Sequence, residues 1–215
     1  MKIDRFSGGS LGTNCYFLTD EETGQIAVID PGFVSGRMER YLAQAGASNV
    51  VLCLLTHGHF DHIGGVDRLR ELTGAKICLP RGDAAFPADP ALNLGDMLAP
   101  GTDCRFRPDR LLDDGDTVRL GNLSIRTLHT PGHTAGSSSF VAGDALFSGD
   151  TLMEGSVGRT DFPTGSWGQM TSSLKKLAAL SGNYRVYPGH GESTTLEEEK
   201  KFNPFLKEAA GESGS

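Results

Sequence analysis

The sequence predicts an α/β protein in which β-sheets pack together with helices on the outside. Segments with the apolar pattern of strands come before, between and after segments with apolar residues at helical spacing. The clearest strand is the continuous apolar run at residues 50–55 (VVLCLL), which is typical of a strand buried on both faces. The clearest helix is the amphipathic segment at residues 169–180 (QMTSSLKKLAAL). Strands and helices interleaved along one chain favour this layered arrangement.

In the N-terminal half, the predicted elements alternate between strands and helices. The first two strand-like segments are joined by Asp-Glu-Glu-Thr-Gly, a turn sequence that predicts a hairpin. Each of the two predicted helices is followed by a glycine, which commonly ends a helix. The predicted strands lie at residues 14–19, 25–30, 50–55 and 76–79, and the predicted helices lie at residues 37–45 and 66–72.

The C-terminal half is predicted to contain short strands and two helices. Residues 82–108 are rich in Pro, Asp and Gly, and their pattern supports no assignment. The last helix, at residues 196–206, contains Pro204, which is expected to end or kink it. No repeat or linker divides the chain, so we expect one domain over residues 1–210 and a disordered tail at 211–215. The predicted strands lie at residues 117–120, 123–129, 138–141, 145–147 and 185–187.

Composition and charge narrow the class of protein. The formal net charge is −7, which disfavours a nucleic-acid or anionic-membrane partner, since such partners require a basic surface. No stretch approaches the roughly 20 apolar residues of a membrane helix, and the N-terminus has no apolar run typical of a signal peptide. The four cysteines are scattered without a Cys-x-x-Cys pair, which favours free thiols. We therefore expect a reduced, cytoplasmic protein with no membrane partner.

The segment at residues 56–65 (THGHFDHIGG) contains three of the six histidines of the chain. His57 and His59 are two residues apart at the end of a predicted strand, so in extended backbone both imidazoles can reach one point. Asp61 and His62 follow where the chain turns into a helix, which lets them face a second point nearby. A polar loop is the alternative interpretation of this segment alone.

Three further segments favour a binding site over a polar loop. His133 and His190 each lie on a Pro-Gly turn after a predicted strand, and Asp150 follows a strand and a glycine. Five of the six histidines therefore lie at strand ends, which is how a rigid scaffold presents reactive groups. Imidazole and carboxylate ligands suit zinc, manganese or iron. Six ligands and one shared carboxylate are enough for two cations, which sit about 3.5–4 Å apart in two-metal sites and can share a hydroxide.

The order of these residues resembles the metal signature of the metallo-β-lactamase-fold hydrolases. The similarity runs from residue 14 (NCYFL, then AVIDPG) to His190, nearly the whole chain. The resemblance implies a four-layer αβ/βα sandwich of two mixed β-sheets, with helices outside and metals at one sheet edge. It also implies that Asp30 supports the site, although a turn-capping role is an equal alternative. The implied ligands are His57, His59 and His133 for the first cation, Asp61, His62 and His190 for the second, and Asp150 between them.

Within this superfamily, an aspartate at position 150 resembles the glyoxalase II (hydroxyacylglutathione hydrolase) branch. The resemblance implies hydrolysis of a small thioester of the S-lactoylglutathione type by a metal-bridging hydroxide. Asp61 would be catalytic, because it would orient the hydroxide and accept its proton. The cofactors would be two divalent cations, zinc first, with iron or manganese as alternatives. Arg159 is a candidate for binding a substrate carboxylate, and a surface salt bridge is its alternative role. The sequence predicts no oligomeric state.

Departures from the glyoxalase II pattern keep a second hypothesis open. The larger enzymes continue into a helical domain with basic residues that hold glutathione, whereas this chain ends in an acidic helix. Residues 158–162 (GRTDF) and the Asn203-Pro204 pair resemble persulfide dioxygenases, which act on thiol-derived substrates with one iron. In that hypothesis His57, His133 and Asp150 hold the iron. A nuclease is disfavoured by the acidic charge, and a metal-binding scaffold without activity is disfavoured because every ligand position is filled.

Overall fold

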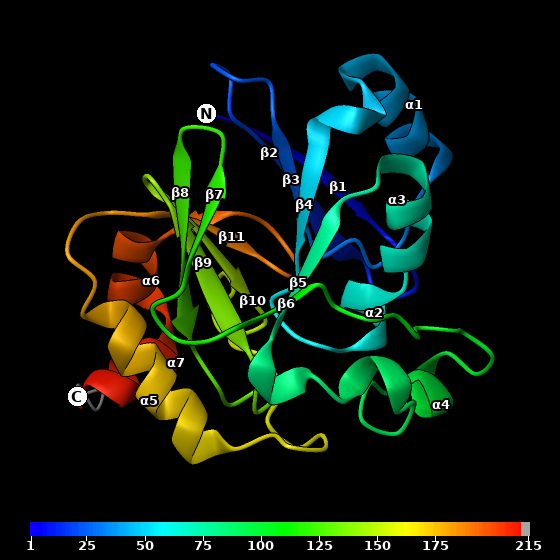
Figure 1. The fold of residues 1–215 in the computed structure, drawn as a ribbon. Helices are drawn as coiled ribbons and strands as arrows, with labels where there is room; N and C mark the ends of the chain where they lie inside the picture. The colour runs from blue at the N-terminus through cyan, green and yellow to red at the C-terminus, as the bar shows by residue number, and fades with distance from the viewer. Residues whose placement is uncertain (212–215) are drawn as a thin grey trace.

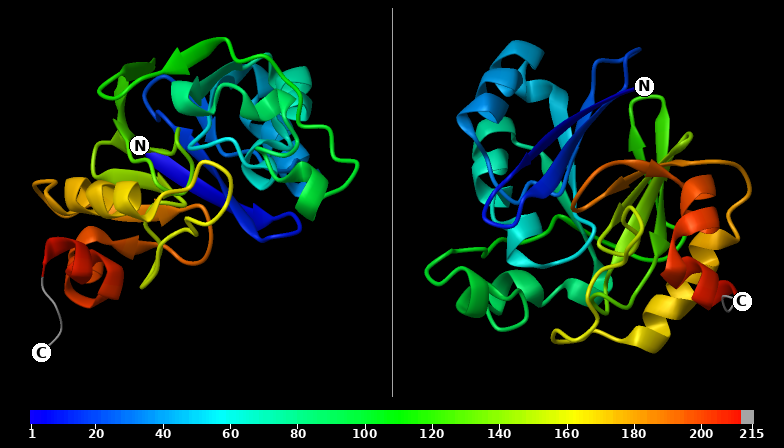
Figure 2. Two further views of the ribbon diagram at one scale, coloured as in Figure 1. Left: turned by 90° about the horizontal axis from the view of Figure 1, so that it is seen from below. Right: turned by 180° about the vertical axis from the view of Figure 1, so that it is seen from behind.

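Two six-stranded β-sheets lie face to face, and helices cover the outer face of each sheet (Figure 1). The computed structural model describes residues 1–211, so the expected disordered tail at 211–215 lies outside the described residues except for Gly211. In both views of Figure 2 the blue-to-teal helices and the yellow-to-red helices lie on opposite sides of the molecule. The predicted four-layer α/β sandwich is confirmed. No helix within residues 1–211 combines the length and the apolar character that a membrane span requires.

The first sheet has the strand order β1-β2-β3-β4-β5-β6. Strands β1, β2 and β3 are antiparallel, which confirms the predicted hairpin, and β3 to β6 are parallel. Two of its strands were not expected from the sequence. Strand β1 is polar, with Phe6 as its single buried residue, and β6 follows the unassigned segment. The strands are β1 (Lys2–Gly8), β2 (Thr13–Thr19), β3 (Ile26–Ile29), β4 (Val50–Leu54), β5 (Lys76–Pro80) and β6 (Arg110–Leu112).

The second sheet has the strand order β12-β11-β10-β9-β8-β7. Its neighbouring strands are antiparallel except β10 and β11, which are parallel. All five strands predicted for this half of the chain are present, and β12 is an additional short strand at the edge. The strands are β7 (Thr117–Leu120), β8 (Leu123–His129), β9 (Ser138–Ala142), β10 (Ala145–Gly149), β11 (Arg185–Pro188) and β12 (Thr194–Thr195).

Helices α1 (Gly36–Ala45) and α3 (Val66–Thr73) cover the first sheet, and α5 (Trp167–Ala178) covers the second together with the two C-terminal helices. The single helix expected at residues 196–206 is instead two helices, α6 (Leu196–Phe202) and α7 (Pro204–Ala210). Asn203 separates them. Its side chain accepts hydrogen bonds from the amides of Phe205 and Leu206 and so begins α7, where Pro204 has no N–H to offer.

Alternating residues of the central strands pack on opposite faces of their sheet. In β2, Cys15 and Phe17 face the helices, whereas Tyr16 and Leu18 face the second sheet. The continuous apolar run of β4 behaves in the same way, so both of its faces are buried as the sequence predicted. Burial on both faces makes these strands a rigid base for the polar loops that follow them.

The segment without a predicted structure, residues 82–108, forms short helical turns along the edge of the sandwich. They are η3 (Phe86–Ala88) and α4 (Gly95–Leu98), joined by tight turns. A further short helix, α2 (Phe60–Ile63), follows β4 and contains part of the histidine-rich motif. Helices α4 and α2 lie on the same side of the molecule (Figure 1), and Leu98 of α4 and Asp61 of α2 line one cavity.

Candidate metal centre

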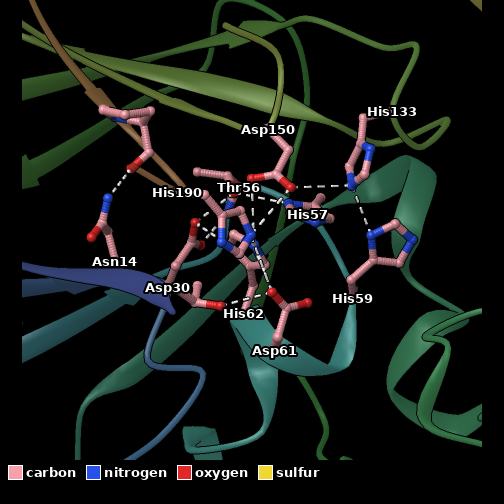
Figure 3. A network of polar contacts seen from close by, with 12 residues as sticks. Asn14, Asp30, Thr56, His57, His59, Asp61, His62, His133, Asp150 and His190 are labelled. Carbon is pink, nitrogen blue, oxygen red and sulfur yellow. Dashed lines mark hydrogen bonds and ion pairs between the residues drawn. The ribbon is translucent and has the colours of Figure 1, made fainter. Parts of the chain in front are cut away.

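The predicted ligands come together at one edge of the two sheets (Figure 3). Five of them lie in the loop after a strand, and the other two lie in a short helix that follows the same strand as the first histidines. Rigid strands thus position the polar groups that follow them. His57 and His59 follow β4, Asp61 and His62 lie in α2, His133 lies between β8 and β9, Asp150 follows β10, and His190 follows β11.

Glycines let these turns approach one another closely. A Cβ atom on Gly58, between the first two histidines, would lie 2.4 Å from Cβ of Phe86. A Cβ atom on Gly189 would lie 2.1 Å from Oδ1 of Asp150 and 2.7 Å from Cε1 of His62. All three distances are far below van der Waals contact, so a larger residue would displace Phe86 at the first position and two ligands at the second.

His57, His59 and His133 form the first group. One nitrogen of each lies within 4.8 Å of the others, and Nδ1 of His59 is 2.9 Å from Nε2 of His133. Nδ1–H of His133 donates to the carbonyl oxygen of Arg159 at 2.7 Å, which leaves its Nε2 lone pair facing the other two rings. Nδ1–H of His57 donates to Oγ1 of Thr56 at 3.1 Å and likewise leaves Nε2 free. The three rings therefore present lone pairs to one point.

Asp61, His62 and His190 form the second group. Oδ2 of Asp61 lies 3.4 Å from Nε2 of His62 and 3.2 Å from Nε2 of His190. The outer nitrogens of both rings are engaged elsewhere, since Nδ1–H of His190 donates to the carbonyl oxygen of Leu11 at 3.2 Å. Thr13 Oγ1 donates to Oδ2 of Asp61 at 2.7 Å and fixes that carboxylate.

Asp150 lies between the two groups. Its Oδ1 is 3.5 Å from Nε2 of His62, and its Oδ2 is 3.5 Å from Nε2 of both His133 and His190. One carboxylate thus reaches ligand atoms of both groups, which is the geometry a bridging ligand requires.

Unpaired buried atoms test whether these residues suit metal ions. Nε2 of His57 and Oδ1 of Asp150 are buried without a hydrogen-bond partner within residues 1–211. A buried polar atom without a partner costs about 1–3 kcal/mol. Both atoms point at the place where the other ligands converge, so a cation there would satisfy them. The donor set of imidazoles and carboxylates is capable of binding metal ions.

Burial keeps two histidines of the first group neutral. Burial, together with the neighbouring imidazoles, lowers the pKa of His57 well below its usual value and lowers the pKa of His59 to about 3. Neutral imidazoles are the form that binds a cation, so His57 and His59 need no deprotonation to act as ligands.

The two histidines of the second group are protonated, because nearby carboxylates raise their pKa values more than burial lowers them. Burial alone would lower the pKa of His62, but Asp61, Asp150 and Asp30 raise it to about 9. The pKa of His190 is raised in the same way to about 10. Burial would raise the pKa of Asp61, yet the charge of His62 and a hydrogen bond with His190 lower it to about 2. Without a cation, protons on these two histidines balance the carboxylates.

The side chain of Asp30 contacts both the backbone after β4 and a histidine of the second group. Its Oδ1 accepts from the amide of Thr56 at 2.7 Å, and its Oδ2 accepts from Oγ1 of Thr56 at 2.6 Å, so it ties the ends of β3 and β4 together. Oδ2 also accepts from Nδ1–H of His62 at 2.9 Å. The residue adopts a left-handed backbone conformation, with a φ of 51°.

Asp83 is a supporting residue that the sequence did not reveal. It is fully buried and accepts hydrogen bonds from the amide of Gly58 at 2.9 Å, the amide of Gly136 at 2.7 Å and Oγ1 of Thr134 at 2.7 Å. It therefore joins the turn of His57 to the turn of His133. It lies in the segment that had no predicted structure, and no local pattern points to these distant partners.

Arg159 lines the cavity above the centre, but its guanidinium is engaged with its own neighbours. Nε and Nη2 donate to the carboxylate of Asp161 at 2.9 and 2.7 Å, and the group stacks on the ring of Phe162 at 4.3 Å. The cavity has a volume of about 390 Å³ and reaches Asp61, Asp150 and His190 at its floor. The arginine thus lies at the rim of a cavity that opens onto the ligand cluster.

The fold and the centre define a class: a four-layer αβ/βα sandwich with a histidine and aspartate metal-binding cluster at one sheet edge. The chain belongs to the metallo-beta-lactamase superfamily, whose family model matches residues 8–190. It is 35% identical to the probable metallo-hydrolase YqgX of Bacillus subtilis, over 96% of this chain and 98% of that protein. It is 34% identical to the hydroxyacylglutathione hydrolase GloC of Haemophilus influenzae, with the same coverage of each chain.

Three solved structures are similar over most of the chain. The B3 metallo-beta-lactamase BLEG-1 superposes with a TM-score of 0.89 at 32% identity, covering 95% of this chain and 99% of that chain. TTHA1623 in a di-iron-bound form has a TM-score of 0.80 at 35% identity, covering 94% and 99%. ETHE1 from Myxococcus xanthus has a TM-score of 0.74 at 33% identity, covering 95% and 84%.

Proposed function

We propose that the protein is a metal-dependent hydrolase that cleaves small thioesters with two bound divalent cations. The observation that carries the proposal is the position of Asp150, whose two oxygens lie 3.5 Å from nitrogens of both histidine groups. The similarity to a hydroxyacylglutathione hydrolase supports a thioester as the substrate.

The residues suit two cations, each held by three ligands and the shared Asp150. His57, His59 and His133 would hold one, and Asp61, His62 and His190 would hold the other. Zinc fits this donor set, and iron or manganese are the alternatives. The similar structure of TTHA1623, in a di-iron-bound form, supports iron as one of them. When bound, such cations act as Lewis acids toward a carbonyl oxygen and lower the pKa of water toward ~7.

Asp61 is the residue we propose to orient the attacking water. Its pKa of about 2 keeps the carboxylate ionised, and Thr13 holds Oδ2, so the carboxylate is a fixed hydrogen-bond acceptor at the floor of the cavity. It accepts a proton from the water as the carbonyl is attacked. The leaving thiolate has an ordinary pKa near ~8.5 and departs without a general acid.

Alanine variants of two ligands test the proposal. We expect His59→Ala and Asp150→Ala to abolish release of thiol from S-lactoylglutathione and from a simple acyl thioester, with unchanged circular dichroism. His129→Ala is the matched control, because His129 is the sixth histidine and its Nε2 contacts the carbonyl of Ala135 outside the cluster. Full activity of either ligand variant would rule out this function.

A persulfide dioxygenase with one iron is the second candidate. The GRTDF sequence at residues 158–162 and the Asn203-Pro204 pair favour it. In that case His57, His133 and Asp150 would hold the iron. Uptake of oxygen in the presence of glutathione persulfide, without thioester turnover, would replace the first candidate by this one.

A further inference from the structure

The cavity above the metal centre has apolar walls. They come from three separate places: the turn between β1 and β2, the segment around α4, and the long loop after β10 that contains the GRTDF sequence. Together they surround a polar floor of ligand side chains. The wall residues are Leu11, Leu94, Leu98, Met153, Val157 and Phe162.

From these walls we propose that the substrate is a thioester with an apolar chain of several carbons beside its carbonyl, and not one dominated by carboxylates. This inference rests on the proposed thioester hydrolysis and names its substrate class. The carbonyl would face the ligand cluster, and the chain would lie along the walls.

Exposed apolar side chains gather at this cavity. Leu11 is 49% exposed and Leu98 is 44% exposed, and both line it. Only a few large apolar side chains within residues 1–211 are as exposed. Contiguous exposed apolar side chains mark a binding surface, because water penalises them until a ligand covers them.

The wall around α4 is fixed to the metal-binding motif. The amide of Phe60, which lies between two ligands, donates to the carbonyl of Asn93 at 2.8 Å. The side chain of Asn93 donates to the carbonyl of Phe86 at 2.8 Å and accepts from the amide of Gly95 at 2.8 Å. Leu94 is held in a left-handed conformation, with a φ of 67°, and only 4% of it is exposed. The wall is thus preformed.

The charges at the rim do not favour a substrate with several carboxylates. Of the cavity residues within 1–211, Arg159 is the only lysine or arginine, and Asp161 already neutralises it at 2.7 Å. Glutathione carries two carboxylates, and this rim offers no unpaired guanidinium or ammonium group to receive them. Binding free energy would instead come from covering the apolar walls.

Two thioester series test the inference on the metal-loaded protein. One extends the acyl group of N-acetylcysteamine thioesters from acetyl to butanoyl, hexanoyl and octanoyl, and the other extends the thiol of acetyl thioesters over the same lengths. In one of the two series, we expect kcat/KM to rise about tenfold for every two methylenes that are added and buried by the walls. The rising series identifies which side of the carbonyl carries the chain.

A variant of one exposed leucine links the effect to the walls. For each protein, kcat/KM for the longest substrate of the rising series is divided by kcat/KM for the shortest. Leu98→Asn should lower this ratio at least fivefold. Phe202→Asn is the control, because Phe202 is 66% exposed on α6 outside the cavity, and it should leave the ratio unchanged. Acetyl turnover with no rise in either series would overturn this inference alone. Cleavage of no thioester at all would overturn the proposed function, and this inference with it.

Discussion

Nδ1 of His62 lies 2.9 Å from Oδ2 of Asp30, and both side chains are almost completely buried. This contact fixes the ring so that Nε2 faces Asp61 and Asp150. The same carboxylate binds Thr56, whose hydroxyl accepts from His57. One aspartate at the end of β3 therefore orients a histidine of each group.

Asp30→Asn should lower the affinity for the second cation, and the protein should stay folded. Asparagine tolerates the left-handed backbone that Asp30 adopts, and its amide oxygen can still accept from Thr56. It removes the charge that holds Nδ1–H of His62, and loss of such a supporting partner costs about 10–100-fold in metal affinity. Competition with a chromogenic chelator measures this affinity. Unchanged binding of both cations would show that Asp30 is only a turn cap.

His190→Ala should reduce the metal content from two cations per chain to one. His190 is the most exposed of the histidine ligands, with 24% of its side chain accessible, so its loss should not unfold the protein. The first group does not include it and should retain its cation. Plasma mass spectrometry of the dialysed variant gives the count, with His129→Ala as the reference. Two cations in both variants would exclude His190 as a ligand.

Metal binding should release protons, and affinity should fall as the pH falls. His62 and His190 have pKa values raised to about 9 and about 10, so the metal-free protein holds protons there at neutral pH. Isothermal titration in two buffers of different ionisation enthalpy should show release of about two protons near pH 7. Binding heats that are independent of the buffer would contradict this.

The metal-free protein should also lose stability at high pH. A histidine whose pKa is raised by folding stabilises the fold fully below its unfolded value of 6.5, and this contribution disappears as the pH passes the folded value. The midpoint of thermal unfolding in chelator should therefore fall as the pH rises from about 6.5 to about 10, where His190 loses its proton in the folded state. A midpoint that rises over this range would mean that the carboxylates do not hold these protons.

Asp83→Ala should destabilise the protein by about 3 kcal/mol or more, since it leaves two buried amides and the Thr134 hydroxyl without their acceptor. Urea unfolding of the metal-free protein measures this cost. Asp83→Asn retains an acceptor oxygen and should cost less. Equal stability of both variants and the unaltered protein would contradict a structural role.

Gly189→Ala should abolish metal binding through Asp150, the ligand that the two groups share. The added methyl group would lie 2.1 Å from Oδ1 of Asp150, which must then move away from His62. Gly168→Ala is the matched control, because a Cβ atom there meets nothing within 4 Å and alanine favours the helix α5 by up to about 1 kcal/mol. Normal metal content in Gly189→Ala would mean that the turns of Asp150 and Gly189 can move apart without loss of the cations.

The central strands and long helices were predictable because their apolar spacing reports burial directly. Strand β1 was missed because it lies at a sheet edge and buries only Phe6. The ligands were recognisable because each follows a strand in a short local pattern. Asp83 and Thr13 were not, since they act on partners 25–53 residues away that only the fold brings near. The extent of the domain over residues 1–210 stays a prediction.

The most direct measurement is the number and identity of metal ions per chain in untagged protein, taken on the sample whose thioester hydrolysis is followed. Two divalent cations per chain, with turnover of S-lactoylglutathione or butanoyl-N-acetylcysteamine that chelation abolishes, is the predicted result. One iron per chain, with oxygen uptake on glutathione persulfide and no thioester cleavage, would contradict it.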